Sequence, residues 1–406
     1  MIHARNCSPA VLSVLFLLLY CVSPAHAQWK PAGAKLMTRW GKTVSPEKVH
    51  QQYPRPQMAR ADWVNLNGLW DYAIRPAAEE SPKEADGKIL VPFPVESSLS
   101  GVGRMVGKEK RVWYRRSFEV PEAWKDRRVL LHFGAVDWET AVWVNGKPAG
   151  NHRGGYDPFT FDVTGLLAPG GGSQRLEVSA WDPSDKGPQP RGKQVSKPGG
   201  IWYTPVTGIW QTVWLEAVPL TSIDSLHIEP DVDGKRLKVT VTMRGSDEVK
   251  ARVKVPALGL SAEGAAGSVI ELGLKEFELW SPGNPKLYDL EVELLSGGKT
   301  VDRVESYFGM RKIALGKDRN GIPRILLNGK PLFQFGPLDQ GWWPDGLYTA
   351  PSDEALRYDL EVTKKLGFNM VRKHVKVEPL RWYYHCDRMG LLVWQDMPNG
   401  GVNARW

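Results

Sequence analysis

Residues 352–396 read SDEALRYDLEVTKKLGFNMVRKHVKVEPLRWYYHCDRMGLLVWQD, and this stretch decides the fold of the C-terminal part of the chain. Ser352 has the side chain of a helix N-cap, and two acidic residues follow it in the first turn. Gly367 is a stop signal for that helix, and Pro379 is a start signal for a second one. Helices and apolar strands are therefore predicted to alternate over residues 352–367, 369–374, 379–390 and 391–396.

A further apolar strand, PLFQFG, is predicted at residues 331–336, ahead of the first helix. The order strand–helix–strand–helix–strand indicates a parallel sheet with crossover helices. In such units the functional side chains gather where the strands end. We therefore expect one rim to collect the polar and aromatic residues that follow the three strands: Asp339 and Trp342, then Arg372 and His374, then Trp394 and Asp396.

Two interpretations of this rim are open. Arg372 and His374 share one face of their strand by the two-residue period, as do Trp394 and Asp396 of the next strand. The rim is then a binding site, or Arg372 and Asp396 form a buried ion pair that only caps the core. The coincidence of three strand ends favours the binding site.

Upstream of this segment the chain is predicted to form two β domains. Between residues 65 and 217, short segments rich in Val, Trp and Phe are separated by Gly, Pro and Asn, and Asn145-Gly146 is a hairpin turn signal. Two packed antiparallel sheets of jelly-roll type fit this pattern. Between about 220 and 310, a second set of alternating strands has the size of an immunoglobulin-like sandwich.

The first 27 residues have the three-part organisation of a secretory signal. Arg5 supplies a positive charge, residues 11–22 (VLSVLFLLLYCV) form a short apolar run, and residues 25–27 (AHA) form a small-x-small cleavage site. The run is too short to favour the alternative of a membrane anchor. A secreted or periplasmic location is expected, with no membrane span after signal removal.

Composition excludes several classes of protein. The chain is 42% hydrophobic and 24% charged, which excludes a disordered or fibrous protein. The net charge of +8 comes without a Lys/Arg block or a nucleic-acid motif, so no nucleic-acid partner is expected. After cleavage Cys386 is the one cysteine left in the sequence, so neither an internal disulfide nor a Cys/His zinc cluster is expected. No metal or cofactor is expected.

Short motifs follow one another in order along the mature chain: LNGLW (66–70), PFP (92–94), WYRR (113–116), WVNG (143–146), GGYDPF (154–159) and GIWQ (208–211). A more specific pattern is Asn369-x-Val371-Arg372, followed by DxxGLLVW at 387–394. Together they resemble glycoside hydrolase family 2, which includes β-galactosidases, β-glucuronidases and β-mannosidases. Members usually have two small residues and then His-Tyr-Pro after the arginine, whereas residues 373–376 here read KHVK.

The resemblance implies a mostly β multidomain protein with three parts after the signal. These are a jelly-roll sugar-binding domain at 28–219, an immunoglobulin-like β-sandwich at 220–311, and the first βα units of a TIM barrel at 312–406.

The resemblance also implies hydrolysis of a β-glycosidic bond with retention, by two glutamates about 5–5.5 Å apart. In the family the acid/base glutamate follows an asparagine, and this sequence contains no Asn-Glu pair. A whole barrel takes about 250 residues, more than the segment 312–406 holds. We therefore expect a fragment whose catalytic residues lie beyond Trp406.

One more site residue follows from the resemblance. Asp182 ends a strand and opens the loop 183–200, which in the family reaches toward the barrel, so Asp182 is a candidate sugar ligand. The partner is then an oligo- or polysaccharide, and the sequence leaves open galactose, mannose or a uronic acid. Two other classes stay open: a non-catalytic carbohydrate-binding protein that uses the jelly roll and its Trp side chains, and a structural β module without a ligand.

The leader generates a direct prediction. Cleavage after Ala27 should give a secreted protein whose N-terminal sequence begins at Gln28. N-terminal sequencing of the exported protein checks this, and a mature protein that still begins at Met1 would contradict it.

Overall fold

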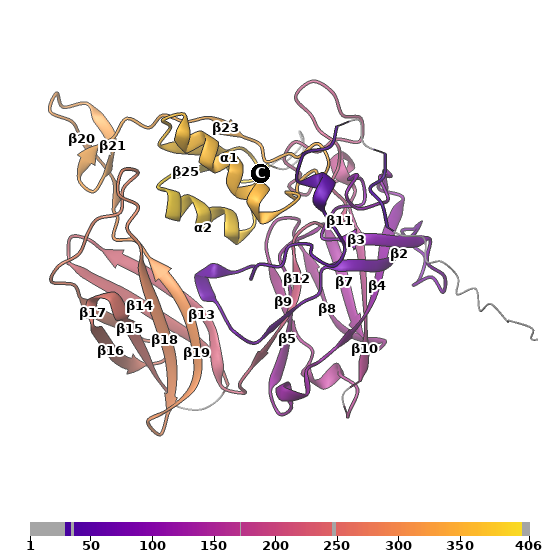
Figure 1. The fold of residues 1–406 in the computed structure, drawn as a ribbon, viewed down its shortest axis with the longest axis horizontal. Helices are drawn as coiled ribbons and strands as arrows, with labels where there is room; N and C mark the ends of the chain where they lie inside the picture. Colours follow the sequence, from indigo (N-terminus) through magenta and orange to yellow (C-terminus); the bar gives the residue numbers. More distant parts are fainter. Residues whose placement is uncertain (1–28, 34–35, 171, 246–248, 400–406) are drawn as a thin grey trace, which may run out of the picture.

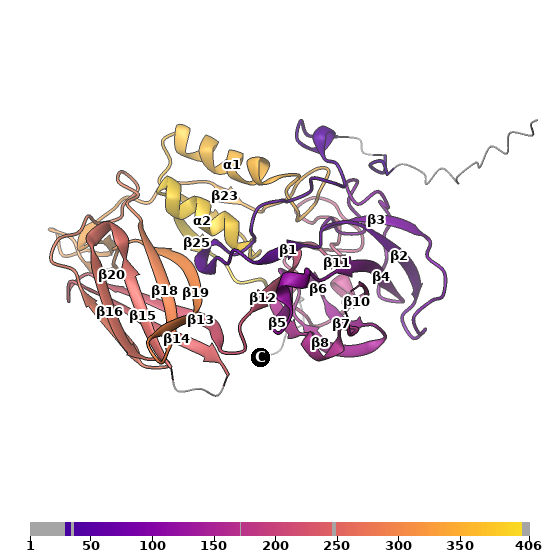
Figure 2. The same cartoon turned by 60° about the horizontal axis from the view of Figure 1, so that its bottom comes forward.

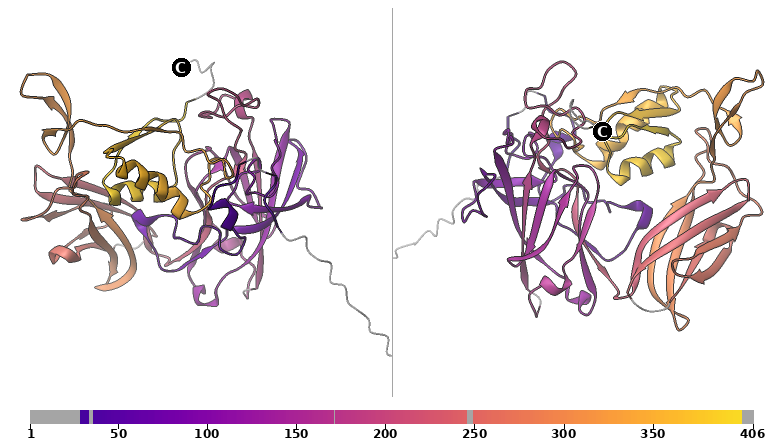
Figure 3. Two further views of the ribbon diagram at one scale, coloured as in Figure 1. Left: turned by 45° about the horizontal axis from the view of Figure 1, so that its top comes forward. Right: turned by 180° about the vertical axis from the view of Figure 1, so that it is seen from behind.

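The computed structural model describes residues 29–33, 36–170, 172–245 and 249–399. The predicted signal at 1–27 lies outside the described residues. Two β domains lie side by side, and a βα segment lies against both of them (Figure 1). Figures 2 and 3 show the same arrangement from other sides. No helix in the described part of the chain is both long and apolar enough to cross a membrane.

The first domain is a sandwich of two antiparallel sheets. The four-stranded sheet has the order β1 (Trp63–Asn65), β12 (Val213–Val218), β5 (Arg128–Phe133), β9 (Phe159–Asp162). The six-stranded sheet has the order β3 (Gly87–Val91), β2 (Gly68–Pro76), β4 (Lys110–Glu119), β10 (Ser173–Trp181), β7 (Glu139–Val144), β8 (Lys147–Arg153). A small pair, β6 (Val136–Asp137) and β11 (Gly208–Ile209), completes it.

Alternation along these strands builds the core of the jelly roll. Trp70, Tyr114, Val142 and Leu215 point between the two sheets and are fully or almost fully buried. The hairpin β7–β8 turns at Asn145-Gly146, where both residues have positive φ (53° and 76°), as the turn signal predicted.

The second domain is a smaller sandwich. One sheet contains β13 (Ser222–Asp231), β14 (Arg236–Arg244) and β17 (Val269–Gly273), and the other contains β16 (Leu260–Ala265), β15 (Lys250–Val255), β18 (Tyr288–Ser296) and β19 (Lys299–Phe308). Val, Leu and Ile at alternate positions fill its separate core, as in Leu237, Val239 and Val241 of β14. The prediction of an immunoglobulin-like sandwich is confirmed.

The βα segment begins with an antiparallel ribbon of β20 (Ile313–Lys317), β21 (Pro323–Leu327) and β22 (Lys330–Pro331). A parallel sheet follows, with β23 (Leu338–Asp339), β24 (Met370–Lys373) and β25 (Leu392–Gln395). Helices α1 (Asp353–Lys365) and α2 (Leu380–Met389) make the crossovers. Ser352 caps α1 as predicted, because its Oγ accepts a hydrogen bond from the Ala355 amide at 3.1 Å.

The predicted strand at 331–336 is wrong. Residues 332–337 form no strand, and the parallel pairing starts only at Leu338. Pro331 and Pro337 carry no amide hydrogen for a regular ladder, and Phe333 and Phe335 are exposed rather than buried in a sheet. The first parallel strand therefore begins after Pro337. The carbonyl of Pro337 accepts a hydrogen bond from the Arg372 amide, and this bond sets the register of the strand.

Residues 53–60, which we call the strap, cross the middle of the molecule and contact all three parts (Figure 1). On the jelly-roll side the contact is the buried carboxylate of Glu216, which accepts hydrogen bonds from Tyr53 Oη (2.6 Å) and Arg55 Nη2 (2.9 Å), and also from Trp214 Nε1 (2.8 Å). Burial alone would raise the pKa of Glu216, but contacts with His132, Arg55 and Tyr53 outweigh it and hold the pKa well below its usual range.

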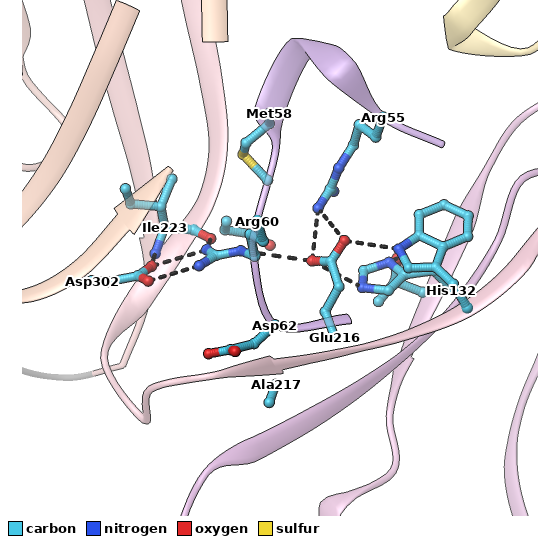
Figure 4. A network of polar contacts seen from close by, with 12 residues as sticks. Arg55, Met58, Arg60, Asp62, His132, Glu216, Ala217, Ile223 and Asp302 are labelled. Atoms are coloured by element: carbon cyan, nitrogen blue, oxygen red, sulfur yellow. Dashed lines mark hydrogen bonds and ion pairs between the residues drawn. The ribbon is translucent and has the colours of Figure 1, made fainter. Parts of the chain in front are cut away.

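On the sandwich side the strap is held by Arg60 (Figure 4). Its guanidinium makes two hydrogen bonds to Asp302, at 2.7 and 2.9 Å, and a third to the carbonyl of Ile223 at 2.8 Å. Its Nε also lies 3.6 Å from Glu216. Arg60 therefore links a carboxylate of the jelly roll to one of the sandwich.

The strap also reaches the βα segment. Gln57 Nε2 donates to the carbonyl of Leu380 at 2.9 Å, and Arg381 Nη1 donates to the carbonyl of Tyr53 at 3.0 Å. Both partners lie in the first turn of α2, so the strap sets where this helix begins relative to the two β domains.

Replacing Asp302 by Ala should destabilise the protein strongly, because it leaves the buried guanidinium of Arg60 without its carboxylate. We expect a loss of about 3–5 kcal/mol in the free energy of unfolding, measured by urea denaturation. Asp224→Ala is the matched control, because the pair Asp224–Arg244 is on the surface of the same sandwich and should contribute less than about 1 kcal/mol. Equal effects of the two substitutions would contradict this role of Asp302.

Candidate functional site

The parallel sheet divides the predicted site residues between its two faces. Cross-strand pairing aligns Leu338, Arg372 and Trp394 in one row, and Asp339, Lys373 and Gln395 in the next. Because neighbouring residues of a strand point to opposite faces, these rows face opposite ways. Val371 and Lys373 face α1 and α2, where Val371 joins the core and Lys373 lies over the Trp382 ring. The row with Arg372 and Trp394 lies on the other side, which we call the open face.

Three of the predicted residues meet on the open face. Asp396 receives two hydrogen bonds from Arg372, from Nε at 3.1 Å and from Nη2 at 2.9 Å. His374 Nδ1 lies 2.7 Å from Asp396 Oδ2. Hydrogen bonds from Arg372 and His374 lower the pKa of Asp396, so this carboxyl is ionised at neutral pH.

The alternative of a buried ion pair does not fit this cluster. The Arg372 side chain is 45% exposed, and Asp396 and His374 are partly exposed. Trp394 is also 47% exposed and points from the neighbouring strand, with its Nε1 donating to Gln334. A hollow of about 540 Å³ along the edge of β25 is lined by Trp394 and Asp396 and also by Tyr383 and Cys386 of α2, so it borders the cluster without including Arg372 or His374. The open face thus combines an indole, a guanidinium, an imidazole and a carboxylate within reach of solvent.

Asp339 does not belong to this cluster, contrary to the prediction of one shared rim. Its carboxylate accepts a hydrogen bond from Lys373 Nζ at 2.6 Å on the helix side of the sheet. Burial opposes ionisation of Asp339, but Lys373 outweighs it and lowers the pKa. The pairing register explains why Asp339 lies on the helix side: Asp339 pairs directly with Lys373, whose side chain points toward the helices.

Lys373 and Lys376 form a buried cluster that the sequence did not reveal. Both are almost fully buried, and both ammonium groups contact Glu378 Oε1, at 2.8 and 2.9 Å. Burial lowers the pKa of Lys376 to about 8. Lys376 Nζ also donates to the carbonyls of Gly341 (2.7 Å) and Tyr348 (2.9 Å), so it holds the loop between β23 and α1 in place. The only sequence signal was the run KHVKVE at 373–378.

Trp342, predicted to lie on the shared rim, does not lie on the open face. Its ring packs against Tyr348, with centroids 4.4 Å apart, and against Tyr203 of the jelly roll, 4.9 Å apart. Thr349 strengthens the same junction, because its Oγ1 donates to the carbonyl of Trp210 at 2.6 Å. Trp342 therefore joins the βα segment to the jelly roll.

Asp182 is also placed inside the protein rather than on the open face. Its residue is 1% exposed, and its Oδ1 accepts from the Ser184 amide at 2.7 Å and from Gln189 Nε2 at 3.3 Å. These bonds shape the start of the loop 183–200, so Asp182 is a structural residue in this arrangement. The loop itself does reach the βα segment, where the Arg191 amide donates to the carbonyl of Asn399 at 2.9 Å.

Two more carboxyl groups lie near Asp182 in the jelly roll. Burial raises the pKa of Asp182 to about 6 and that of Glu96 to about 8, and burial together with Asp182 raises the pKa of Asp137 well above its usual value. Oε1 of Glu96 and Oδ1 of Asp137 have no hydrogen-bond partner within the described part of the chain. At neutral pH this cluster retains protons, and the wide sequence separation of its members hid it from sequence analysis.

The described residues offer no metal centre. Over 29–399, apart from the short gaps, no three His, Cys, Asp or Glu side chains are arranged to hold a metal ion.

Comparison with known proteins identifies the class that this fold and site define. The model of the glycosyl hydrolases family 2 sugar-binding domain matches residues 89–216, and a second model of glycosyl hydrolases family 2 matches residues 221–311. The two matches together cover more than half of the chain and coincide with the two β domains. The protein belongs to glycosyl hydrolases family 2, which confirms the resemblance drawn from its motifs.

The similar proteins include β-galactosidases and β-glucuronidases. A β-galactosidase from Thermoanaerobacter pseudethanolicus is 27% identical over 303 residues, which is 70% of this chain and 39% of that protein. A β-glucuronidase from Paenibacillus borealis is 27% identical over 302 residues, or 69% of this chain and 50% of that protein. The structure of Ruminococcus gnavus β-glucuronidase has a TM-score of 0.70 at 20% identity, over 86% of this chain and 61% of that one, and shows the fold. The chain thus spans about half or less of the length of these curated relatives.

The raised pKa of Glu96 gives a prediction about pH. The folded protein holds a proton on Glu96 that the unfolded chain releases near the ordinary value of 4.5. The contribution of this group to stability should therefore fall as pH rises from about 4.5 to about 8. At 1.36 kcal/mol per pKa unit the full shift corresponds to at most about 5 kcal/mol.

Thermal unfolding of wild type and Glu96→Gln between pH 5 and pH 8 measures this effect. The wild type should lose stability relative to the variant as pH rises. Glu109→Gln, at an exposed position, is the control and should follow the wild type. Parallel curves for wild type and Glu96→Gln would contradict the prediction.

Proposed function

We propose that the protein is a secreted or periplasmic β-glycosidase that hydrolyses a β-linked glycan with retention of configuration. Membership of glycosyl hydrolases family 2 supports the class of activity, and the leader at 1–27 supports export. In this proposal β23, β24 and β25 are the first parallel strands of a catalytic barrel.

The observation that carries the proposal is the cluster of Arg372, His374 and Asp396 on the open face. Asp396 orients both neighbours through hydrogen bonds of 2.7–3.1 Å. Fixed donors and acceptors of this kind hold sugar hydroxyl groups, and the exposed indole of Trp394 offers a flat surface to a pyranose ring. The cluster binds and orients the sugar.

The type of sugar follows in part from the same contacts. Arg372 already uses Nε and Nη2 on Asp396, so its fork is not free to hold a carboxylate through the same two atoms. The cluster therefore suits sugar hydroxyl groups, as in a neutral hexose, better than the carboxylate of a uronic acid.

Positioning alone does not break a glycosidic bond. Retention requires two carboxylates about 5–5.5 Å apart on one side of the sheet. Asp396 and Asp339 are the carboxylates of the parallel strand ends in the described residues, and they lie on opposite faces, paired to Arg372 and Lys373. We therefore propose that residues 28–406 bind a sugar but supply no acid and nucleophile pair.

A non-catalytic carbohydrate-binding protein is the second candidate function. The same observation favours it, because a site that positions a sugar without a carboxylate pair is a binding site. The two candidates differ in whether the full gene product hydrolyses the sugar that residues 28–406 bind.

Binding and hydrolysis by residues 28–406 test the proposal together. We expect weak binding of methyl β-galactoside in ligand-observed NMR, and only background hydrolysis of aryl β-glycosides. Replacing Arg372 by Ala should weaken binding by about 1.5–3 kcal/mol, the contribution of a charge-assisted hydrogen bond. Arg357→Ala on the surface of α1 is the matched control and should bind like the wild type.

Each outcome has a clear meaning. Equal binding by Arg372→Ala and wild type would show that the open-face cluster is not the sugar site. Clear turnover by residues 28–406 would contradict the absence of a carboxylate pair. Binding without hydrolysis by the full gene product would leave the carbohydrate-binding protein as the function.

A further inference from the structure

A loop of the jelly roll lies across the ends of the parallel strands. It spans residues 183–203, between β10 and β11, and we call it the rim loop. Beside the end of β23, Tyr203 Oη donates a hydrogen bond to Gln340. Beside the end of β24, Gly192 lies so close to Val375 that a Cβ on this glycine would be 2.5 Å from the Val375 carbonyl oxygen. The rim loop is therefore in direct contact with the ends of two strands.

The rim loop also contacts the segment that follows the third strand. The Arg191 amide donates to the carbonyl of Asn399 at 2.9 Å. Asn399 follows closely after Asp396 in the sequence, and Val375 follows directly after His374. The rim loop thus borders the edge of the sheet where the Arg372 cluster lies, although the loop itself belongs to the first domain.

Three carboxyl groups inside the jelly roll hold the rim loop from the other side. We call them the carboxyl trio: Glu96, Asp137 and Asp182. Asp182 accepts a hydrogen bond from the Ser184 amide at the start of the loop, at 2.7 Å. Asp137 accepts from Gln194 Nε2 in the middle of the loop, at 2.8 Å. Glu96 accepts from the Thr207 amide just beyond its end, at 2.9 Å. The trio therefore fixes the beginning, the middle and the end of one loop.

No positive charge lies beside the trio. In the described residues none of the three carboxyl groups forms an ion pair with Lys, Arg or His. The other titratable groups that face the trio are three phenols, whose pKa values burial raises so that they stay neutral: Tyr114, Tyr156 and Tyr348. Oε1 of Glu96, Oδ1 of Asp137 and Oε1 of Gln189 are sealed from solvent and have no hydrogen-bond partner in the same part of the chain. The trio is thus surrounded by acceptors and neutral groups.

Loss of protons makes this arrangement costly. Burial raises the pKa of all three carboxyl groups, so protons are retained while the rim loop is in place. Ionisation places like charges close together where neither a cation nor water offsets them. Movement of the rim loop admits water to these charges and lowers the cost, so a rising pH favours the moved loop over the closed one.

We propose that the carboxyl trio is a proton-dependent latch for the rim loop. While the trio retains its protons, the loop lies on the ends of the three parallel strands. When the trio is ionised, the loop moves away and uncovers that edge of the sheet. The latch itself does not rest on the proposed glycosidase activity; only its effect on access to the Arg372 cluster does.

Hydrogen exchange of the mature protein, followed by mass spectrometry of its peptides, tests the latch. An unstructured peptide that exchanges in the same sample corrects for the effect of pH on the exchange chemistry. After this correction, peptides from the rim loop should exchange about tenfold faster at about pH 8.5 than at about pH 6, the factor that corresponds to one pKa unit. Peptides from β14 in the second domain should show no such change.

A double variant, Glu96→Gln with Asp137→Asn, imitates the protonated trio and should keep the rim loop protected at both pH values. Asp185→Asn is the matched control, because Asp185 also holds this loop, through the Ser196 amide at 3.3 Å. Hydrogen bonds from Ser196 outweigh burial and lower the pKa of Asp185, so this carboxyl is ionised throughout the range. Asp185→Asn should therefore change the exchange of the loop by the same factor at both pH values.

Two results overturn the proposal. Equal exchange of the wild-type rim loop at both pH values, after correction, would show that ionisation does not release the loop. Faster exchange at the higher pH in the double variant as well would show that another group controls the loop. The first result is obtained from the wild type alone, so the test does not depend on the folding of the variant.

Discussion

The carboxylate of Glu216 is the contact on which the arrangement of the three parts depends. It is fully buried and ionised, and it keeps that charge because of its contacts with His132, Arg55 and Tyr53, together with the hydrogen bond from Trp214. A buried charge without such partners would be costly, so the strap has to lie against the jelly roll. Arg60 of the same strap donates to Asp302 of the second domain. This bond fixes the position of the second domain relative to the jelly roll.

The open face depends indirectly on the position of the strap, because the strap holds a helix that supports the parallel strands. The strap holds the start of α2 through Gln57 and Arg381, and α2 packs behind β24 and β25. Lys376 fixes the loop between β23 and α1 from the other direction. The Arg372 cluster is therefore exposed to solvent but mounted on strands whose backs are packed, which suits a site that must hold a ligand in one orientation.

Local patterns predicted most of the fold and only part of the site. The cap at Ser352, the turn at Asn145 and the strand period that places Arg372 with His374 all act over a few residues, so the sequence shows them directly. Asp339 was misplaced because pairing starts after Pro337 and turns its side chain toward Lys373. Glu96 and Glu216 acquire partners from distant segments, as in the pair Arg55 and Glu216, which are 161 positions apart in the sequence. No local pattern records such pairs.

The position of the strap in the chain has a consequence for how the protein is made. Residues 53–60 leave the ribosome before Glu216, Asp302 and Arg381, to which they are finally bound. The jelly roll can close around its own core while Arg60 still lacks its partner in the second domain, since domains form as units during synthesis. The strap is thus synthesised before any of its partners, and its contacts are completed only when α2 has emerged.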